Sequence, residues 1–282
     1  MGVVTAAALA ALVGRGGVVL LTGAGMSTGS GIPDYRGPTG IARGATPMTF
    51  QAFTTDPVAH QRYWARSHLG WRVIARAEPN AAHLAVGDLQ RAGLIDAVIT
   101  QNVDGLHQAG QARDVLELHG SLDRVVCLRC DERTPREQLE ARLREVNPRW
   151  TAEVSDLKPD GDVDLAPDLV AGFVTVGCPV CGGQLKPDVV FFGESVPRPR
   201  VEQCFAAVEA ASALLVLGSS LTVMSGYRFV LRASKLGIPI AIVNQGATRG
   251  DDRADMCIDG PLGEVLPALV SAVSLTGRAA SG

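Results

Sequence analysis

The stretch that most constrains the fold of this chain is a short apolar run that leads directly into a glycine-rich loop. Residues 18–21 are all apolar, and residues 22–37 carry glycine at several closely spaced positions. A buried strand that ends in glycines exposes backbone N–H groups, and a helix beginning there directs its positive end toward a phosphate. The pattern predicts a dinucleotide-binding loop. A simple tight turn between strand and helix is the alternative that this stretch leaves open.

The loop departs from the fingerprint of hydride-transferring dehydrogenases. Those enzymes carry Gly-x-Gly-x-x-Gly after the strand and an acidic residue about 20 positions further on. Here Thr28 stands where the third glycine belongs, and no acid lies at that distance. The loop continues instead with a proline, an acid, an aromatic residue and a base at positions 33–36. This continuation disfavours a dehydrogenase and indicates a function beyond turning the chain.

Composition and charge narrow the classes of partner. The 282 residues include 26 basic and 29 acidic side chains, so the net charge of −3 favours neither nucleic acid nor an anionic membrane. Residues 1–14 are apolar but lack the basic start of a signal peptide, and they predict a short N-terminal helix. No apolar run reaches the roughly 18 residues of a spanning helix. We expect a soluble, cytoplasmic protein with no nucleic-acid or membrane partner.

Two Cys-x-x-Cys pairs, Cys127/Cys130 and Cys178/Cys181, predict a metal site. Paired knuckles of this kind are typical of zinc held by four thiolates. Disulfides and redox centres are the alternatives. The absence of an export signal disfavours disulfides, and the occurrence of two Cys-x-x-Cys pairs together disfavours a redox centre. Because four protein ligands leave no position for water, we expect one structural Zn²⁺ rather than a catalytic one.

Strand-like apolar runs alternate with helical patterns over the rest of the chain, which predicts an α/β fold with right-handed crossovers. We expect a Rossmann-like parallel sheet in a large domain formed by residues 1–122 and 186–282. A small zinc-binding module, residues 123–185, is inserted into it. Cys204 and Cys257 lie outside the metal pattern and are expected in the core.

Polar residues follow several of the predicted strands, where open α/β sheets bind ligands. Asn102 and Asp104 follow the strand at 94–99, and His119 lies in the strand-like run 115–122 beside a glycine. Tyr63 and Arg66 are three apart in a helical segment and so share a face. For this pair a surface arginine covering a half-buried tyrosine is the simpler interpretation.

These motifs together resemble the sirtuins, in the same order and over nearly the whole chain. The resemblance is carried by the stretches 23–27, 31–36, 100–104, 119–120, 218–220 and 243–246 and by the paired Cys-x-x-Cys. The stretch 186–194, the Tyr63-x-x-Arg66 pair and the insert rich in Pro, Asp and Gly between the cysteine pairs resemble the class II branch, which includes mitochondrial sirtuin 4.

The resemblance implies a cleft where NAD is consumed as a co-substrate. His119 would be the general base, and Asn102 and Asp104 would complete the catalytic group. The residues implied in NAD binding are Gly23, Ala24, Gly25, Ser27, Asp34, Tyr35, Arg36, Gln101, Asn102, Asp104, Gly218, Ser219, Ser220, Asn244, Gln245, Gly246 and Leu262. An acyl-lysine protein or peptide would add as a strand beside Val190, Phe191, Phe192, Gly193 and Glu194, with Tyr63 and Arg66 at the floor of the acyl pocket.

The implied activity is NAD-dependent protein lysine deacylation, a transferase reaction of acyl-lysine and NAD⁺ that yields lysine, nicotinamide and O-acyl-ADP-ribose. Two alternatives stay open. One is a protein mono-ADP-ribosyltransferase that uses the same cofactor site. The other is a non-catalytic, zinc-stapled module that binds NAD or ADP-ribose and regulates a partner. The motifs do not specify the acyl group, so they do not distinguish a deacetylase from a deacylase that removes other acyl groups.

Overall fold

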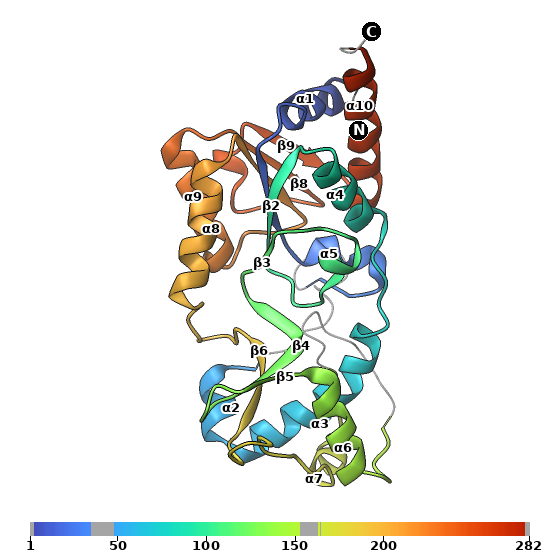
Figure 1. Ribbon diagram of the computed structural model, residues 1–282, viewed down its shortest axis with the longest axis vertical. Coiled ribbons are helices and arrows are strands. Elements are labelled where there is room, and N and C mark those ends of the chain that lie inside the picture. The colour runs from blue at the N-terminus through green and yellow to red at the C-terminus, as the bar shows by residue number, and fades with distance from the viewer. Residues whose placement is uncertain (1–2, 35–47, 153–162, 164, 280–282) are drawn as a thin grey trace.

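The computed structural model describes residues 3–34, 48–152, 163 and 165–279, and it is elongated, with two units along its length (Figure 1). One unit holds a six-stranded sheet, and the other holds a three-stranded sheet. This arrangement confirms the predicted α/β fold with a Rossmann-like parallel sheet.

The large sheet is parallel throughout, in the order β3-β2-β1-β7-β8-β9. Every residue of β1 and of β7 is buried. Such continuous apolar runs are typical of parallel strands covered on both faces. The six strands are β1 (Val18–Thr22), β2 (Ile95–Thr100), β3 (Val115–Glu117), β7 (Ala213–Leu217), β8 (Ile240–Asn244) and β9 (Met256–Asp259).

Helices cover both faces of this sheet, and alternate residues of β1 point to opposite layers. Leu20 packs in the core formed with α1 (Val3–Val13), α4 (Ala81–Arg91) and α10 (Leu262–Ala279). Val19 packs in the core formed with α8 (Arg198–Ala210) and α9 (Met224–Leu236). Because all six strands are parallel, their carboxyl ends lie at the same edge of the sheet.

The second unit is built around an antiparallel sheet in the order β5-β4-β6. Its core joins Phe53 and Trp64 with Leu139 and Leu185, and so combines early helices with the cysteine-bearing part of the chain. Residues before position 122 thus contribute to this core. The boundaries drawn at 122/123 and 185/186 stay a prediction. The elements are α2 (Phe50–Thr55), α3 (Pro57–Ile74), β4 (Gly120–Cys127), β5 (Arg133–Pro135), α6 (Arg136–Val146), α7 (Pro167–Ala171) and β6 (Leu185–Val189).

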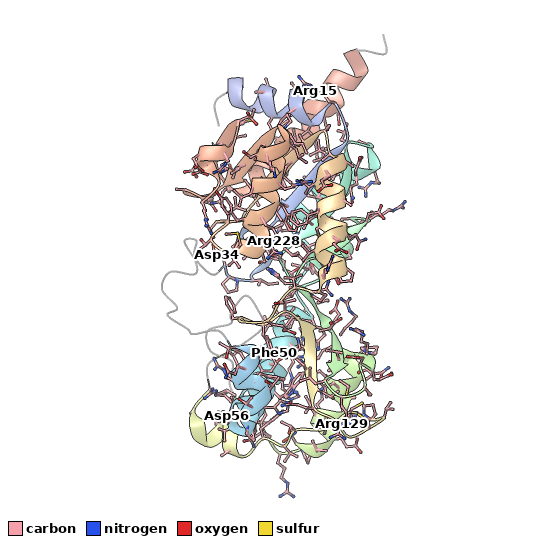
Figure 2. The ribbon with its side chains drawn as sticks, turned by 90° about the vertical axis from the view of Figure 1, so that its left-hand side faces the viewer. Arg15, Asp34, Phe50, Asp56, Arg129 and Arg228 are labelled. Carbon is pink, nitrogen blue, oxygen red and sulfur yellow. The ribbon has the colours of Figure 1, made fainter. Side chains whose placement is uncertain are left out.

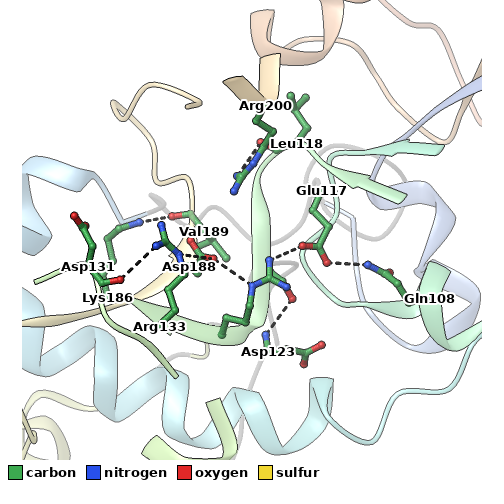
Figure 3. Close-up of polar contacts among 12 residues, drawn as sticks. Gln108, Glu117, Leu118, Asp123, Asp131, Arg133, Lys186, Asp188, Val189 and Arg200 are labelled. Carbon is green, nitrogen blue, oxygen red and sulfur yellow. Dashed lines mark hydrogen bonds and ion pairs between the residues drawn. The ribbon is translucent and has the colours of Figure 1, made fainter. Parts of the chain in front are cut away.

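A charged network lies where the chain passes from the large sheet into β4 (Figure 3). Arg124 on β4 bonds to Glu117 at 2.5 Å and to Asp188 on β6 at 3.2 Å. Beside it, Gly120 has φ +86°, and a Cβ there would lie 1.9 Å from the Asp188 carbonyl oxygen. The close pairing of β4 with β6 at this point therefore requires glycine at position 120.

Several local expectations are confirmed. The N-terminal helix forms as α1, and Asn80 caps α4 by accepting from the backbone N–H groups of Ala82 and His83. The segment 56–77 is helical as α3, which runs through Gly70 without a break. Cys204 is buried.

Other expectations are wrong. The glycine loop forms two short 3-10 turns, Ala24–Met26 and Thr28–Ser30, rather than opening a helix. The threonine and proline at 134–135 predict a helix that Thr134 caps, but Thr134 lies in β5, and α6 begins at Arg136 without a side-chain cap. Cys257 is exposed on the edge strand β9, where one face is left uncovered. The short elements α2, α7 and β9 were not predicted, because they are too short to show a clear period.

Among the described residues, none of the helices is both long and apolar enough to span a bilayer.

Candidate active site and metal centre

A cavity of about 1100 Å³ opens at the carboxyl ends of the large sheet. It is lined by the glycine loop, the ends of β1, β2, β7 and β8, and the segment after β6. Figure 2 shows Asp34 and Arg228 on the large-sheet side of the boundary between the units and Phe50 on the other side. The cavity volume is just above the roughly 300–1,000 Å³ typical of small-molecule and cofactor sites, so the cavity can hold a large ligand.

Two glycine turns build one wall of the cavity. The Gly25 N–H donates to the Gly218 carbonyl at 2.9 Å. A Cβ on Gly25 would lie 2.9 Å from Gly218 Cα, and Gly218 itself has φ +59°. The loops that follow β1 and β7 therefore touch backbone to backbone, which no side chain would permit.

The Asn102 and Asp104 side chains are fixed against this loop. Asn102 Nδ2 donates to the Gly23 carbonyl at 3.0 Å and to Ser27 Oγ at 3.1 Å. Ser27 Oγ in turn donates to Asp104 Oδ2 at 2.6 Å. Burial raises the pKa of the Asp104 carboxyl, and hydrogen bonds from Ser27 and the Leu106 backbone oppose that shift. The chain thus brings these predicted residues together.

Gln101 connects the ends of β2 and β7. Its Nε2 donates to Ser219 Oγ at 2.9 Å and to the Thr22 carbonyl at 3.2 Å. Ser219 and Ser220 follow Gly218 along the same wall. The predicted residues of the two strand ends therefore form one continuous polar surface.

His119 lies between β3 and β4 and lines the cavity. Its Nδ1 is 3.0 Å from the Gln101 carbonyl oxygen, and its Nε2 is 2.8 Å from Ser225 Oγ. Burial lowers the pKa of His119, the Gln101 carbonyl opposes this shift, and the nearby Arg200 and Arg228 lower it further. This lowered pKa favours the neutral form of the imidazole, which can accept a proton.

The far end of the cavity is formed by the loop after β8 and the start of α10. Asn244, Gln245 and Leu262 line it. Gly246 lies just behind the lining residues and donates its N–H to Asp259 Oδ1 at 3.3 Å. Because α10 begins at Leu262, its N-terminal N–H groups make this end suited to an anionic ligand.

The segment Val190 to Glu194 lines the side of the cavity nearest the small unit. The Val190 N–H donates to the His119 carbonyl at 2.8 Å. Glu194 Oε2 accepts from the Phe191 N–H at 2.8 Å and from Lys186 Nζ at 3.1 Å. These bonds close the segment into a compact loop beside His119.

Tyr63 and Arg66 are not among the described residues that line the cavity. Tyr63 is buried in an aromatic cluster, with its ring 5.2 Å from that of Phe191, which does reach the cavity. Arg66 donates from Nε to the Val163 carbonyl. Among the described residues, Tyr63 therefore packs behind the wall residue Phe191, and the role of the pair in an acyl pocket stays a prediction. Tyr35 and Arg36, also predicted in NAD binding, lie outside the described residues.

The four predicted metal ligands form a single cluster. The Sγ atoms of Cys127, Cys130, Cys178 and Cys181 all lie within 4.8 Å of one another, and the closest pairs are 3.4–3.8 Å apart. Thiolates about 2.3 Å from a tetrahedral zinc ion are about 3.8 Å from each other, whereas a disulfide brings sulfurs to about 2.05 Å. The cluster therefore fits zinc and not a pair of disulfides.

Two cavity residues, Ser225 and Arg228, were missed by the sequence analysis. Both lie in the first turns of α9, where a serine and an arginine on a helix carry no signal of their own. Their position depends on the packing of α9 against the end of β7, which no local pattern records.

Comparison with known proteins identifies the family. The family model described as "SIR2: Sir2 family" matches residues 23–225. The chain belongs to the Sir2 family. Among curated relatives of this Sir2-family chain, NAD-dependent protein deacetylase 1 of Streptomyces coelicolor is 56% identical over 92% of the chain and 87% of the relative. The NAD-dependent protein deacetylase of Bordetella bronchiseptica is 52% identical over 89% of the chain and 92% of the relative.

Solved structures agree with this membership. One described as "Structural Basis for the Mechanism and Regulation of Sir2 Enzymes" has a TM-score of 0.76 and 32% identity, over 96% of the Sir2-family chain and 98% of the other. Another, described as "Sir2-p53 peptide-NAD+", has a TM-score of 0.75 and 30% identity, over 95% and 98%.

Proposed function

We propose that the protein is an NAD-dependent protein lysine deacetylase. The observation that carries the proposal is the position of His119, which bonds to the Gln101 carbonyl and lines the same large cavity as the fixed Asn102 and Asp104 side chains. The names of the relatives, NAD-dependent protein deacetylases, support the same activity. Polar groups of the strand ends lie along one side of the cavity and the backbone of residues 190–194 lies along the other, which supports a dinucleotide on the first side and a peptide on the second.

In this proposal NAD is the co-substrate whose glycosidic bond is broken. The glycine loop and the ends of β7 and β8 hold its phosphates and riboses. Asn102 and Asp104 orient the groups next to the bond that breaks. His119 accepts a proton from a ribose hydroxyl after the acyl oxygen has displaced nicotinamide.

The peptide adds beside residues 190–194 as an extra strand, since backbone pairing at an exposed edge recognises an extended chain without requiring particular side chains. The Val190 N–H, bonded to the His119 carbonyl, ties this edge to the base. The acyl-lysine is then delivered into the cavity next to His119.

The test is turnover of an acetyl-lysine peptide with NAD⁺. We expect nicotinamide and O-acetyl-ADP-ribose to form in equal amounts, and His119→Ala to abolish the acetylated product. Labelled protein without acyl product would favour mono-ADP-ribosyl transfer instead. Binding of ADP-ribose with no nicotinamide release from any acyl-peptide would favour a non-catalytic regulatory module.

A larger or acidic acyl group, as in the class II branch, is the second candidate substrate class. It rests on the class II motif likeness and on the Tyr63-x-x-Arg66 spacing, since a guanidinium can pair with an acyl carboxylate. Arg66→Lys should lower the ratio of glutaryl to acetyl turnover if Arg66 binds that carboxylate. An unchanged ratio would contradict a role of Arg66 in binding the acyl carboxylate and would favour a structural role, in which Arg66 donates to the Val163 carbonyl.

A further inference from the structure

The hydroxyl of Ser225 lies on the ring nitrogen that His119 would use as a base. Nδ1 of His119 is 3.0 Å from the Gln101 carbonyl oxygen, which can only accept. Nδ1 therefore carries the ring proton, and Nε2 presents its lone pair. Because Ser225 Oγ is 2.8 Å from Nε2, its O–H donates to that lone pair.

A neutral imidazole has one lone pair, and here Ser225 occupies it. A substrate hydroxyl that enters the cavity can pass its proton to Nε2 in two ways only. It can displace Ser225, or it can transfer the proton through the Ser225 hydroxyl. Ser225 lines the same cavity as His119, so its Oγ is open to a hydroxyl bound there.

The packing of α9 favours transfer over displacement. Gly226, next to Ser225, lies so close to Gln101 that a Cβ there would be 2.5 Å from Gln101 Oε1. Gln101 in turn holds the His119 ring through its carbonyl and Ser219 through its amide. Ser225, Gln101 and His119 are therefore held as one packed unit, which fixes the backbone of Ser225 and keeps its Oγ within reach of Nε2.

We propose that Ser225 relays the proton from the substrate hydroxyl to His119. The inference rests on the proposed function and adds a residue to it. The substrate O–H bond breaks as a new Oγ–H bond forms on Ser225, and the original Ser225 proton moves to Nε2. His119 becomes an imidazolium, the serine hydroxyl is restored, and the electron pair stays on the substrate oxygen.

The relay also accounts for the charge that develops on the ring. After transfer, the Nε2–H donates back to Ser225 Oγ, because a hydroxyl rotates freely between donor and acceptor. A hydrogen bond from a charged donor is roughly twice as strong as a neutral one. The same serine that is a donor in the resting site therefore stabilises the product of the proton transfer.

The test compares Ser225→Ala with Ser225→Thr, which keeps the hydroxyl. Two rates are measured: exchange of labelled nicotinamide into NAD⁺, which precedes the His119 step, and formation of O-acyl-ADP-ribose. General acid–base steps contribute about 10²–10⁴-fold, so we expect the alanine variant to lose about tenfold or more of product formation while exchange stays within about twofold. The threonine variant should retain both rates.

Two results would overturn the relay. Product formation at the wild-type rate or faster in Ser225→Ala would mean that the serine is displaced. A parallel loss of exchange and product formation in the alanine variant would mean that Ser225 only supports the structure.

A second measurement needs no turnover and separates this inference from the proposed function. The ¹⁵N shift of His119 Nε2, assigned with His119→Ala, should report an accepted hydrogen bond in the wild type and in Ser225→Thr, but not in Ser225→Ala. If the wild type turns over no acyl-peptide, the proposed function fails, and the relay fails with it. If the three shifts are the same, the relay fails even when the wild type is active.

Discussion

At the scale of single residues, the site depends on a carboxylate and an amide that hydrogen bonds hold against the glycine loop. Asp104 accepts from Ser27 Oγ at 2.6 Å and from the Leu106 N–H at 2.9 Å. Asn102 spans the Gly23 carbonyl and Ser27. These side chains are therefore held in place before any ligand binds.

Asp104→Asn should lower kcat/KM for NAD⁺ by about 10- to 100-fold, since an amide replaces one acceptor oxygen with a donor that faces the Ser27 hydroxyl. The control is Asp123→Asn, an exposed carboxylate that is not among the described residues lining the cavity, and this variant should stay within about threefold of wild type. Steady-state kinetics of both variants check this. Equal losses in the two variants would contradict the role given to Asp104.

Two buried histidines make the fold sensitive to acid. Burial lowers the pKa of His83 to about 4, and burial together with the nearby His83 lowers the pKa of His107 to about 3. Their unfolded-state pKa is about 6.5, so the stability they contribute is complete above that pH and is lost as pH falls toward 4 and 3. His107 Nε2 is 2.9 Å from Thr22 Oγ1 at the end of β1. Protonation of His107 at low pH therefore changes a contact close to the cavity.

At pH 5 each of these histidines should cost about 2 kcal/mol of unfolding free energy relative to pH 8. Denaturant unfolding at the two pH values measures this. His83→Gln removes one titrating group and should reduce the difference by about 2 kcal/mol. A difference unchanged by that variant would contradict the assignment to buried histidines.

At the scale of elements, the contact between two strand-end turns decides whether the cavity forms. A Cβ on Gly218 would lie 2.7 Å from the Gly25 carbonyl carbon, and φ at Gly218 is +59°. Neither turn can move, because each is the direct continuation of a fully buried strand.

Gly218→Ala should therefore weaken ADP-ribose binding by about tenfold or more and destabilise the fold by about 1–3 kcal/mol. Gly172→Ala is the control, since a Cβ there meets no atom closer than 3.9 Å and φ is not positive. Calorimetric titration and thermal unfolding measure the two effects. Binding at wild-type affinity in Gly218→Ala would show that the turns separate more easily than their packing indicates.

How far the sequence predicted these elements follows from the range of the forces involved. The capped helix α4 and the buried strands β1 and β7 follow from local patterns, and so do the paired cysteines. The polar strand ends could be placed at one edge because parallel strands share their direction. The contact of Ser225 with His119 depends on how separate elements pack, and no local pattern of residues in the sequence reports that packing.

At the scale of the whole molecule, the metal site is expected to stabilise the small unit and to leave the chemistry unchanged. One thiolate pair begins at the last residue of β4 and the other lies just before β6, with β5, α6 and α7 between them. Structural zinc sites typically bind with about 10–16 kcal/mol. One zinc per chain should therefore survive gel filtration.

Cys127→Ser should lose the metal and lower the unfolding temperature by several degrees. Cys257→Ser is the control, because that thiol is exposed and outside the cluster. Elemental analysis and thermal unfolding measure both. Full metal content in Cys127→Ser, or none in the wild type, would contradict the assignment.

The core shared by α2, α3 and the cysteine-bearing strands affects how the chain folds during synthesis. The Trp64 indole N–H bonds to the Leu185 carbonyl, 121 residues further along. At ribosomal rates of about 5–20 residues per second, α2 and α3 emerge about 6–24 s before this partner exists. Their apolar faces stay uncovered over that interval. The yield of folded protein in a cell should therefore depend on chaperones that protect nascent chains, and it should fall if the stretch between Trp64 and Leu185 is lengthened.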